Sequence, residues 1–490
     1  MAPRDWPGWL QDLKPDVDAT HRDRMAFTQR FTERFGRERP APESEVEAFY
    51  RLRGIAAEAV RVWSPGRQPQ LDQFLELAIV DAHDAAVDAM ACIASGYGAP
   101  AIALLRRQYE LTLLLVAGWE NPERLATEME RALRKPYTDD AHAELAARGM
   151  FGAVMPSAAV LRDLGLGESS KLDDIEKVVK SVSHGGLYAG GFYLSANRER
   201  LLDLRVEDAM QFSQVAHASV GLSSVSAAMI GKRLGYQLVY RDVEPIFGVE
   251  AVQQRDDHAT SMIDNVFPQV LDMIWSANVG IGSISLSFGE AIGKRPYDLL
   301  RRQAMVIVDA FETVWEATEL FMRGRLAGSA TLIRRLFELS LELQSWAQVP
   351  DAMANRFKKT GGESTPPTTV LIRLIHGAKS GPLQRRTYST LCSAAHGGAQ
   401  AQAYLLGLHP IRGIVVTPAP TFAYTHHRWL LGTLISALDA VLGAALIIAG
   451  RVDSDIGRSH ALHLHMFRNA YHTLDLGLIP NKDLDEGIVT

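Results

Sequence analysis

The chain has 490 residues, of which 47% are hydrophobic and 22% are charged. This balance is typical of folded globular proteins, and the length allows two or more domains. The formal net charge of −6 counts against binding of nucleic acid through bulk positive charge, although it permits a small basic site.

The two cysteines, Cys92 and Cys392, have neither the spacing of a metal site nor the number needed for a disulfide framework. Residues 1–16 lack a basic segment followed by an apolar run, so we expect no signal peptide. These features favour a soluble protein in the reducing cytoplasm.

The sequence predicts an all-α fold, because Ala, Leu, Arg and Glu dominate its long segments and alternating β-branched patterns are scarce. Only short pieces such as 411–417 are candidates for strands. In chain order we expect a polar helical lead-in at 1–43, a helical domain at 44–235, a second at 236–455 and a C-terminal tail at 456–490.

The two predicted domains resemble each other. Residues 79–122 align without a gap to residues 307–350 at an offset of 228 (307 − 79), with 15 identities. Chance would give about three at average composition. The matched pairs include Asp81 and Asp309, Arg106 and Arg334, Arg107 and Arg335, and Glu110 and Glu338. We therefore expect two tandem-duplicated helical bundles related by pseudo-two-fold symmetry.

A second matched block supports the duplication. Residues 181–186 (SVSHGG) match residues 393–398 (SAAHGG) at an offset of 212 (396 − 184). The difference of 16 residues (228 − 212) predicts an insertion in the first copy, in a surface loop around 135–167. The corresponding segment of the second copy, 361–367, also reads as a loop.

Residues 430–450 form an apolar segment long enough to span a bilayer. Asp439 lies near its middle, where a charge is costly in lipid. Because a helix that is apolar on all sides is also typical of a protein core, we expect a buried helix of a bundle, with a membrane span as the alternative.

Each copy carries an Arg-x-x-x-Glu pair on a largely apolar helix: Arg106 with Glu110, and Arg334 with Glu338. Arginine before glutamate is the less favourable order for local helix stabilisation, so a third partner is implied. The alternative is a structural ion pair that fixes helix register.

The matched histidines are the candidate third partners. Ser lies three residues before His184 and His396, on the same helical face, and two glycines follow each histidine. We expect each histidine to lie beside the Arg and Glu of its own copy; the alternative is a core histidine at a tight helix crossing. The predicted catalytic residues are Arg106, Glu110, His184, Arg334, Glu338 and His396.

Metal and cofactor signatures are missing from the sequence. Asp81 and Asp309 are matched acids near the same helices, but there is no helical Glu-x-x-His or His-x-x-x-His pair. There is also no nucleophile elbow, phosphate-binding loop or dinucleotide fingerprint. We therefore expect neither a bound metal nor a cofactor.

The order Arg-x-x-x-Glu, loop, Ser-x-x-His resembles an uncharacterised family of bacterial helical domains, over residues 79–235 and 307–450. That family is distantly similar to the HEPN superfamily, many members of which are metal-independent ribonucleases of toxin and phage-defence systems. Their sites combine Arg and His from both protomers of a dimer, and a tandem duplication would place such an interface inside one chain.

The resemblance has one clear departure. The HEPN nuclease motif separates Arg from His by four to six residues, whereas Arg106 and His184 are far apart. The motif spacing occurs only at Arg458 and His463, outside the matched blocks, where the alternative is a solvated tail.

These observations lead to one functional hypothesis and one alternative. The repeated polar residues would form pockets that bind or hydrolyse a phosphate-bearing ligand, either RNA or a small molecule. Arginine offers bidentate phosphate contacts and histidine exchanges protons near neutral pH. A homo-oligomer is compatible with this hypothesis, and no membrane partner is expected. The alternative is a non-catalytic interaction or scaffold protein in which the motifs are structural.

Overall fold

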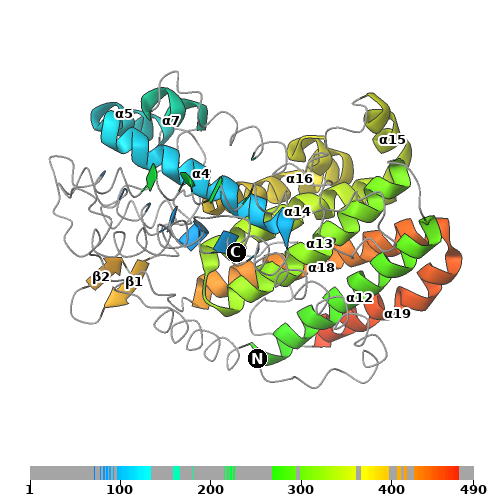
Figure 1. Cartoon of the computed structure of the whole chain (residues 1–490). Coiled ribbons are helices and arrows are strands. Elements are labelled where there is room, and N and C mark those ends of the chain that lie inside the picture. Colours follow the sequence, from blue (N-terminus) through cyan, green and yellow to red (C-terminus); the bar gives the residue numbers. More distant parts are fainter. Residues whose placement is uncertain are drawn as a thin grey trace, which may run out of the picture.

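The computed structural model describes residues 97–133, 158–165, 267–293, 298–359, 366–396, 406–409, 413–416 and 424–473, with further single positions between 71 and 92, at 179 and between 215 and 226. This part of the chain is helical except for one two-stranded hairpin, which confirms the all-α class. Figure 1 shows its long helices gathered around a common core.

Helix α14 (Leu326–Gln348) lies at the centre of the fold. It packs against α13 (Leu299–Met322), α16 (Thr368–Ala395) and α18 (Tyr424–Val452), and it also contacts α4 (Gly98–Glu120). Leu, Ala, Arg and Glu give α14 its helical propensity, and its neighbours bury it on nearly every side. Its charged residues must therefore find partners inside the protein.

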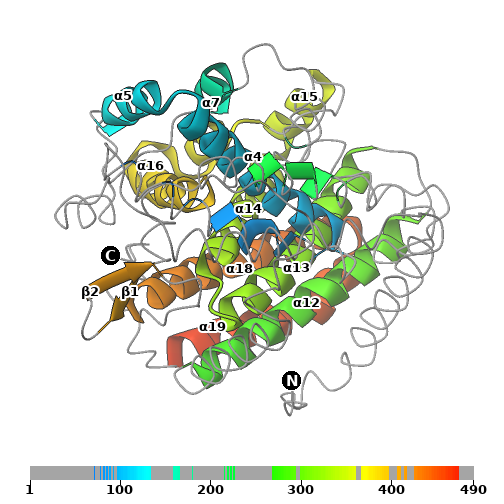
Figure 2. The ribbon, with the colours of Figure 1, turned by 60° about the vertical axis from the view of Figure 1, so that its left-hand side comes forward.

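The remaining helices flank this centre. On one side, α12 (Pro268–Ile292) packs against α13, α18 and α19 (Ser454–Thr473). On the opposite side, α7 (Ala158–Gly165) packs against α4 and α5 (Pro122–Leu133), as Figure 2 shows. Helix α15 (Pro350–Lys359) directly follows α14. Prolines begin α5, α12 and α15, at a position where the missing N–H of proline costs nothing.

The matched sequence blocks have matched local structures. Helix α14 begins and ends 228 residues after α4 (326 − 98 and 348 − 120), and α15 begins 228 residues after α5 (350 − 122). The turn before each long helix closes in the same way. Tyr97 N donates to Cys92 O at 2.8 Å, and Arg325 N donates to Leu320 O at 2.9 Å.

Ion pairs are buried in the core of the described part. Two of them are matched at the same offset: Arg107 Nε donates to Asp81 Oδ1 at 2.8 Å, and Arg335 Nε donates to Asp309 Oδ1 at 3.0 Å. Burial of a charge is tolerated only with such a partner, because an unpaired buried charge costs several kcal/mol. Other buried pairs are Arg302–Glu342 and Arg325–Asp88.

Helix α18 contains the apolar segment 430–450. It is the one helix of the described residues that is long and apolar enough to cross a membrane, and 67% of its most apolar window is buried inside the protein. Asp439 pairs with Arg468 of α19, with Nε 2.7 Å from Oδ1. In this fold α18 is thus a core helix with a satisfied acidic side chain.

The described residues that the sequence assigned to a C-terminal tail are helical. Residues 454–473 form α19, which packs against α12 and α18. Gly450 and Gly457 allow the close approach of α18 and α19, since a Cβ built on Gly457 would lie 3.1 Å from Gly450 Cα. The exposed face of α19 is largely charged and polar, so the composition of this segment did not indicate that its other face is packed.

The short strand candidate and the insertion are partly described. Strand β2 (Gly413–Val416) lies within the expected segment and pairs antiparallel with β1 (Leu406–His409). Within the segment expected to hold the insertion, residues 158–165 form α7 rather than a loop. The lead-in at 1–43 and the boundary between 235 and 236 lie outside the described residues.

Gly328, in the first turn of α14, provides a test of core packing. A Cβ there would lie 2.3 Å from Asp88 Oδ2. We expect Gly328→Ala to push Asp88 away from Arg325 and lower the free energy of unfolding in urea by about 1–3 kcal/mol. Gly443→Ala is the control, because its Cβ would lie 3.7 Å from Arg468 Nη2 and alanine favours the helix. Equal stability of the two variants would contradict the tight Asp88 contact.

Candidate functional site

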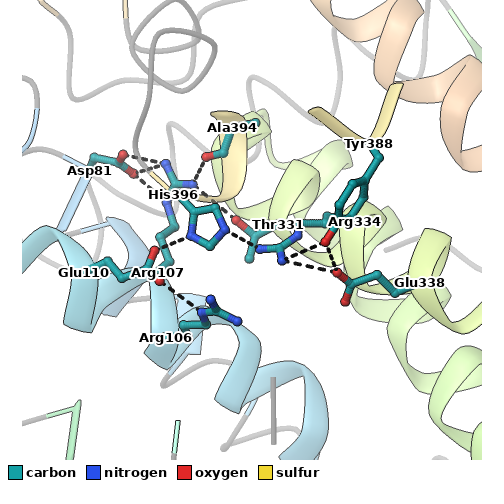
Figure 3. Close-up of polar contacts among 10 residues, drawn as sticks. All are labelled: Asp81, Arg106, Arg107, Glu110, Thr331, Arg334, Glu338, Tyr388, Ala394 and His396. Carbon is teal, nitrogen blue, oxygen red and sulfur yellow. Dashed lines mark hydrogen bonds and ion pairs between the residues drawn. The ribbon is translucent and has the colours of Figure 1, made fainter. Parts of the chain in front are cut away.

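Charged and polar side chains gather where α4, α14 and the C-terminal end of α16 meet (Figure 3). We call this group the junction cluster. Its members are Arg106 and Glu110 from α4, Arg334 and Glu338 from α14, Tyr388 from α16, and His396, which caps the end of α16. Equivalent pairs on the two matched helices therefore contribute to one cluster.

His396 links the two pairs and has a defined tautomer. Its Nε2 lies 2.8 Å from Arg334 Nη1, and its Nδ1 contacts Glu110 Oε2. Because arginine can only donate hydrogen bonds, Nε2 must be the unprotonated acceptor. The proton then resides on Nδ1 and is donated to the carboxylate of Glu110. These contacts specify a neutral imidazole.

The ionisation of the two partners agrees with this arrangement. Burial lowers the pKa of His396; Glu110 opposes this shift and Arg334 adds to it. Burial alone would raise the pKa of Glu110, but its contacts with His396 and Arg106 outweigh burial and lower it to about 2. Arg106 Nε donates to Glu110 Oε1 at 3.0 Å. Near neutral pH the cluster thus holds an ionised Glu110 beside a neutral His396.

Glu338 occupies the other side of Arg334. Its Oε1 accepts from Tyr388 Oη at 2.8 Å, from Arg334 Nη2 at 3.2 Å and from Thr368 Oγ1 at 3.5 Å. Burial raises the pKa of Tyr388, so the phenol keeps its proton and donates it. The Tyr388 ring also lies over the Arg334 guanidinium, 5.6 Å from its carbon to the ring centroid. Cys392 lies nearby on α16, and burial raises the pKa of its thiol.

Arg107 lies next to the junction cluster and holds the end of α16 in place. Its guanidinium pairs with Asp81, donates to Thr331 Oγ1 at 3.2 Å and donates to the carbonyl of Ala394. Ala394 lies two residues before His396, so this contact fixes the end of α16 that presents the imidazole (Figure 3). Arg107 is a positioning residue in this arrangement.

The predicted site residues are only partly grouped as expected. Arg334 contacts both Glu338 and His396, and His396 also contacts Glu110 on α4, the helix matched to α14. Arg334, Glu338 and His396 therefore lie together as expected, and the additional contact with Glu110, which the sequence did not predict, arises because the end of α16 lies between α4 and α14. His184 lies outside the described residues. The catalytic roles themselves stay predictions.

The HEPN-like spacing at Arg458 and His463 does not form a comparable group. Arg458 pairs with Asp455, and both side chains are more than three-quarters exposed. His463 instead lies buried between α19 and α12, with Gly280 opposite it. A helix places residues five apart on different faces, which explains why the two side chains separate.

Some residues of the site were not predicted from the sequence. Tyr388 and Thr368 have no repeated signal and come together with α14 only through the packing of α16. Asp81 and Arg107 were visible as a matched pair with Asp309 and Arg335, but their pairing across helices was not read from the sequence. The identical 26-residue separation within each pair was the available signal.

The chemistry available at the junction cluster is anion binding and proton exchange. Its two arginines carry positive charge that two glutamates balance, and the side-chain exposures are 17% for Arg106 and 26% for His396. Across the described positions, no group of three or more His, Cys, Asp or Glu residues is arranged to hold a metal ion.

No family model, curated protein or solved structure matches this chain.

Acid should weaken the fold through His396. Its pKa is lowered in the folded protein, so the unfolded chain takes up the proton first. The stabilising contribution is complete above about pH 6.5 and is lost as the pH falls through the folded pKa. Urea unfolding at about pH 7.5 and about pH 5 checks this, with His396→Asn as the non-titrating comparison. Parallel pH dependence in the two proteins would refute the assignment of a neutral imidazole.

The matched ion pairs should have similar energetic weight. Asp81→Asn and Asp309→Asn each leave a buried arginine with a neutral partner, which should lower the free energy of unfolding by about 3–5 kcal/mol. Only Asp81→Asn should also move the His396 ring resonances in NMR spectra, because Arg107 holds the carbonyl of Ala394. Unchanged His396 resonances in a folded Asp81→Asn variant would count against the positioning role.

Proposed function

We propose that the chain binds a phosphate-bearing ligand at the junction cluster, with RNA as the first candidate, and that His396 exchanges a proton during its hydrolysis. The observation that carries this proposal is the placement of His396 between Glu110 and Arg334. A carboxylate that holds Nδ1–H leaves Nε2 as the basic atom, which is the arrangement required of a general base.

Arg334 is the partner that a phosphate would engage. A guanidinium binds phosphate oxygens through paired donors, and such a contact would draw Nη1 away from His396. Nε2 would then be available to accept a proton from an attacking hydroxyl. Glu110 stabilises the imidazolium that results, since its contact with Nδ1 strengthens when the ring is charged.

The location of the cluster agrees with a tandem duplication, which we propose as the origin of the chain. The equal offset of α4 with α14 and of α5 with α15 supports it, as do the matched ion pairs at Asp81 and Asp309. A site between two copies corresponds to the dimer-interface sites that the HEPN resemblance implies. On this proposal the protein is soluble and cytoplasmic and acts in defence or as a toxin.

RNA cleavage and binding test the proposal directly. We expect His396→Ala to lower the cleavage rate of a single-stranded RNA by about 100-fold or more, the usual contribution of general acid–base catalysis. Binding of the same RNA, measured by fluorescence anisotropy, should change much less. His465→Ala is the control, because His465 is an exposed histidine on α19 away from the cluster.

One outcome would exclude a catalytic role for the matched histidines. If His184→Ala combined with His396→Ala leaves RNA cleavage at the level of the unaltered protein, the catalytic proposal is wrong. The scaffold alternative then applies, and the cluster serves to join α4, α14 and α16. Circular dichroism and urea unfolding of each variant check that any loss of activity is not caused by a loss of folding.

A further inference from the structure

Arg334 uses its donors differently from two other buried arginines of the core, Arg335 and Arg302. Arg335 engages Asp309 with both Nε and Nη2, at 3.0 and 2.5 Å, and Arg302 engages Glu342 in the same two-point manner, at 3.0 and 3.0 Å. Arg334 reaches Glu338 only through Nη2, at 3.2 Å. Its Nε is buried and has no hydrogen-bond partner among the described residues.

An unpaired buried donor on a guanidinium is energetically costly, and here it lies on the edge that binds oxyanions best. The Nε and Nη2 donors of arginine point in parallel and fit two oxygens of one carboxylate or phosphate. In Arg334 only Nη2 of this edge contacts the carboxylate, and Nε has no hydrogen-bond partner among the described residues. The structure therefore contains a two-point anion site that its present occupant fills with one oxygen.

The present occupant is held as a ligand would be. A single oxygen of Glu338 receives Tyr388 Oη, Arg334 Nη2 and Thr368 Oγ1, which belong to two different helices. The side chain of Glu338 is 15% exposed, and a change of its rotamer would move the carboxylate without unfolding α14. The donors would remain in place, because Tyr388 and Thr368 belong to α16.

We infer that Glu338 is an internal stand-in for the phosphate of the ligand, and that it covers an oxyanion subsite built from Arg334, Tyr388 and Thr368. A phosphate group would displace the carboxylate and engage both Nε and Nη2, with the Tyr388 hydroxyl as a further donor. This inference rests on the proposed function, since it specifies how the ligand is held. Glu338 acts as a competitor that weakens binding of small anions and yields to a larger ligand with additional contacts.

Neutralising the competitor tests the subsite. We expect Glu338→Gln to bind inorganic phosphate about tenfold more tightly than the unaltered protein, as measured by calorimetry, because the amide competes less well for the guanidinium. Glutamine retains an acceptor oxygen for Tyr388, so the fold should persist. Adding Tyr388→Phe to this variant should reverse part of the gain, since it removes one donor to the anion.

A matched control removes the same charge elsewhere. Glu128→Gln on α5 also loses a partly exposed glutamate from an ion pair, with Arg131, and should bind phosphate as the unaltered protein does. Phosphate affinity of Glu338→Gln that is equal to or weaker than that of the unaltered protein overturns the inference. An equal gain in Glu128→Gln overturns it too, because the effect would then be one of net charge.

The outcome is separable from the proposed function. If phosphate affinity rises in Glu338→Gln but His396→Ala leaves RNA cleavage intact, the subsite stands and the catalytic proposal falls. If cleavage depends on His396 but phosphate affinity does not respond to Glu338, the subsite falls alone. Thermal denaturation with and without phosphate provides a second readout, since a ligand that binds the folded state raises its stability.

Discussion

The anchoring of Arg107 is the interaction on which the junction cluster depends. A guanidinium has five donors and cannot lose its charge, so a buried one must be surrounded by acceptors. Arg107 meets this demand with Asp81, Thr331 and the carbonyl of Ala394. These three partners come from the helical segment before α4, from α14 and from α16. The burial of one side chain thereby fixes the relative positions of the elements that form the site.

The burial of α14 imposes a second constraint of the same kind. A central helix is surrounded by other helices, so its charged residues need partners within the protein. Arg335 is satisfied by Asp309, and Glu342 is satisfied by Arg302. Arg334 and Glu338 point toward α16, where their side chains are 9% and 15% exposed. Packing therefore separates the fully enclosed charges of α14 from those at the junction cluster.

The sequence predicted helices well and the geometry of the site only in outline. The all-α class followed from composition. The matched blocks located α4 and α14, because the repeated pattern of Arg, Glu and Leu is visible in the sequence alone. Helix α19 was missed, since its exposed face is polar and its contact with α18 depends on Gly450 and Gly457. Spacing along one chain could not show that His396 lies between two helices.

The pairing of His396 with Glu110 illustrates why such a contact cannot be read from one sequence. The two residues are 286 positions apart, and their encounter depends on how α16 packs across α4 and α14. A motif defines which residues share a helix face, whereas contacts between helices depend on crossing geometry. The matched blocks identified the right residue types but assigned the histidine to a single copy.

Adjacent arginines on the matched helices have taken different roles, and helix geometry explains the difference. Neighbouring positions on an α-helix point about 100° apart, so Arg334 and Arg335 cannot face the same partners. Arg335 points inward and forms a closed two-point pair with Asp309. Arg334 points toward α16 and divides its donors between His396 and Glu338, and its Nε has no hydrogen-bond partner within the described part of the chain. The closed pair stabilises the fold, and the open one is the place where we propose that an incoming phosphate improves on the contacts already present.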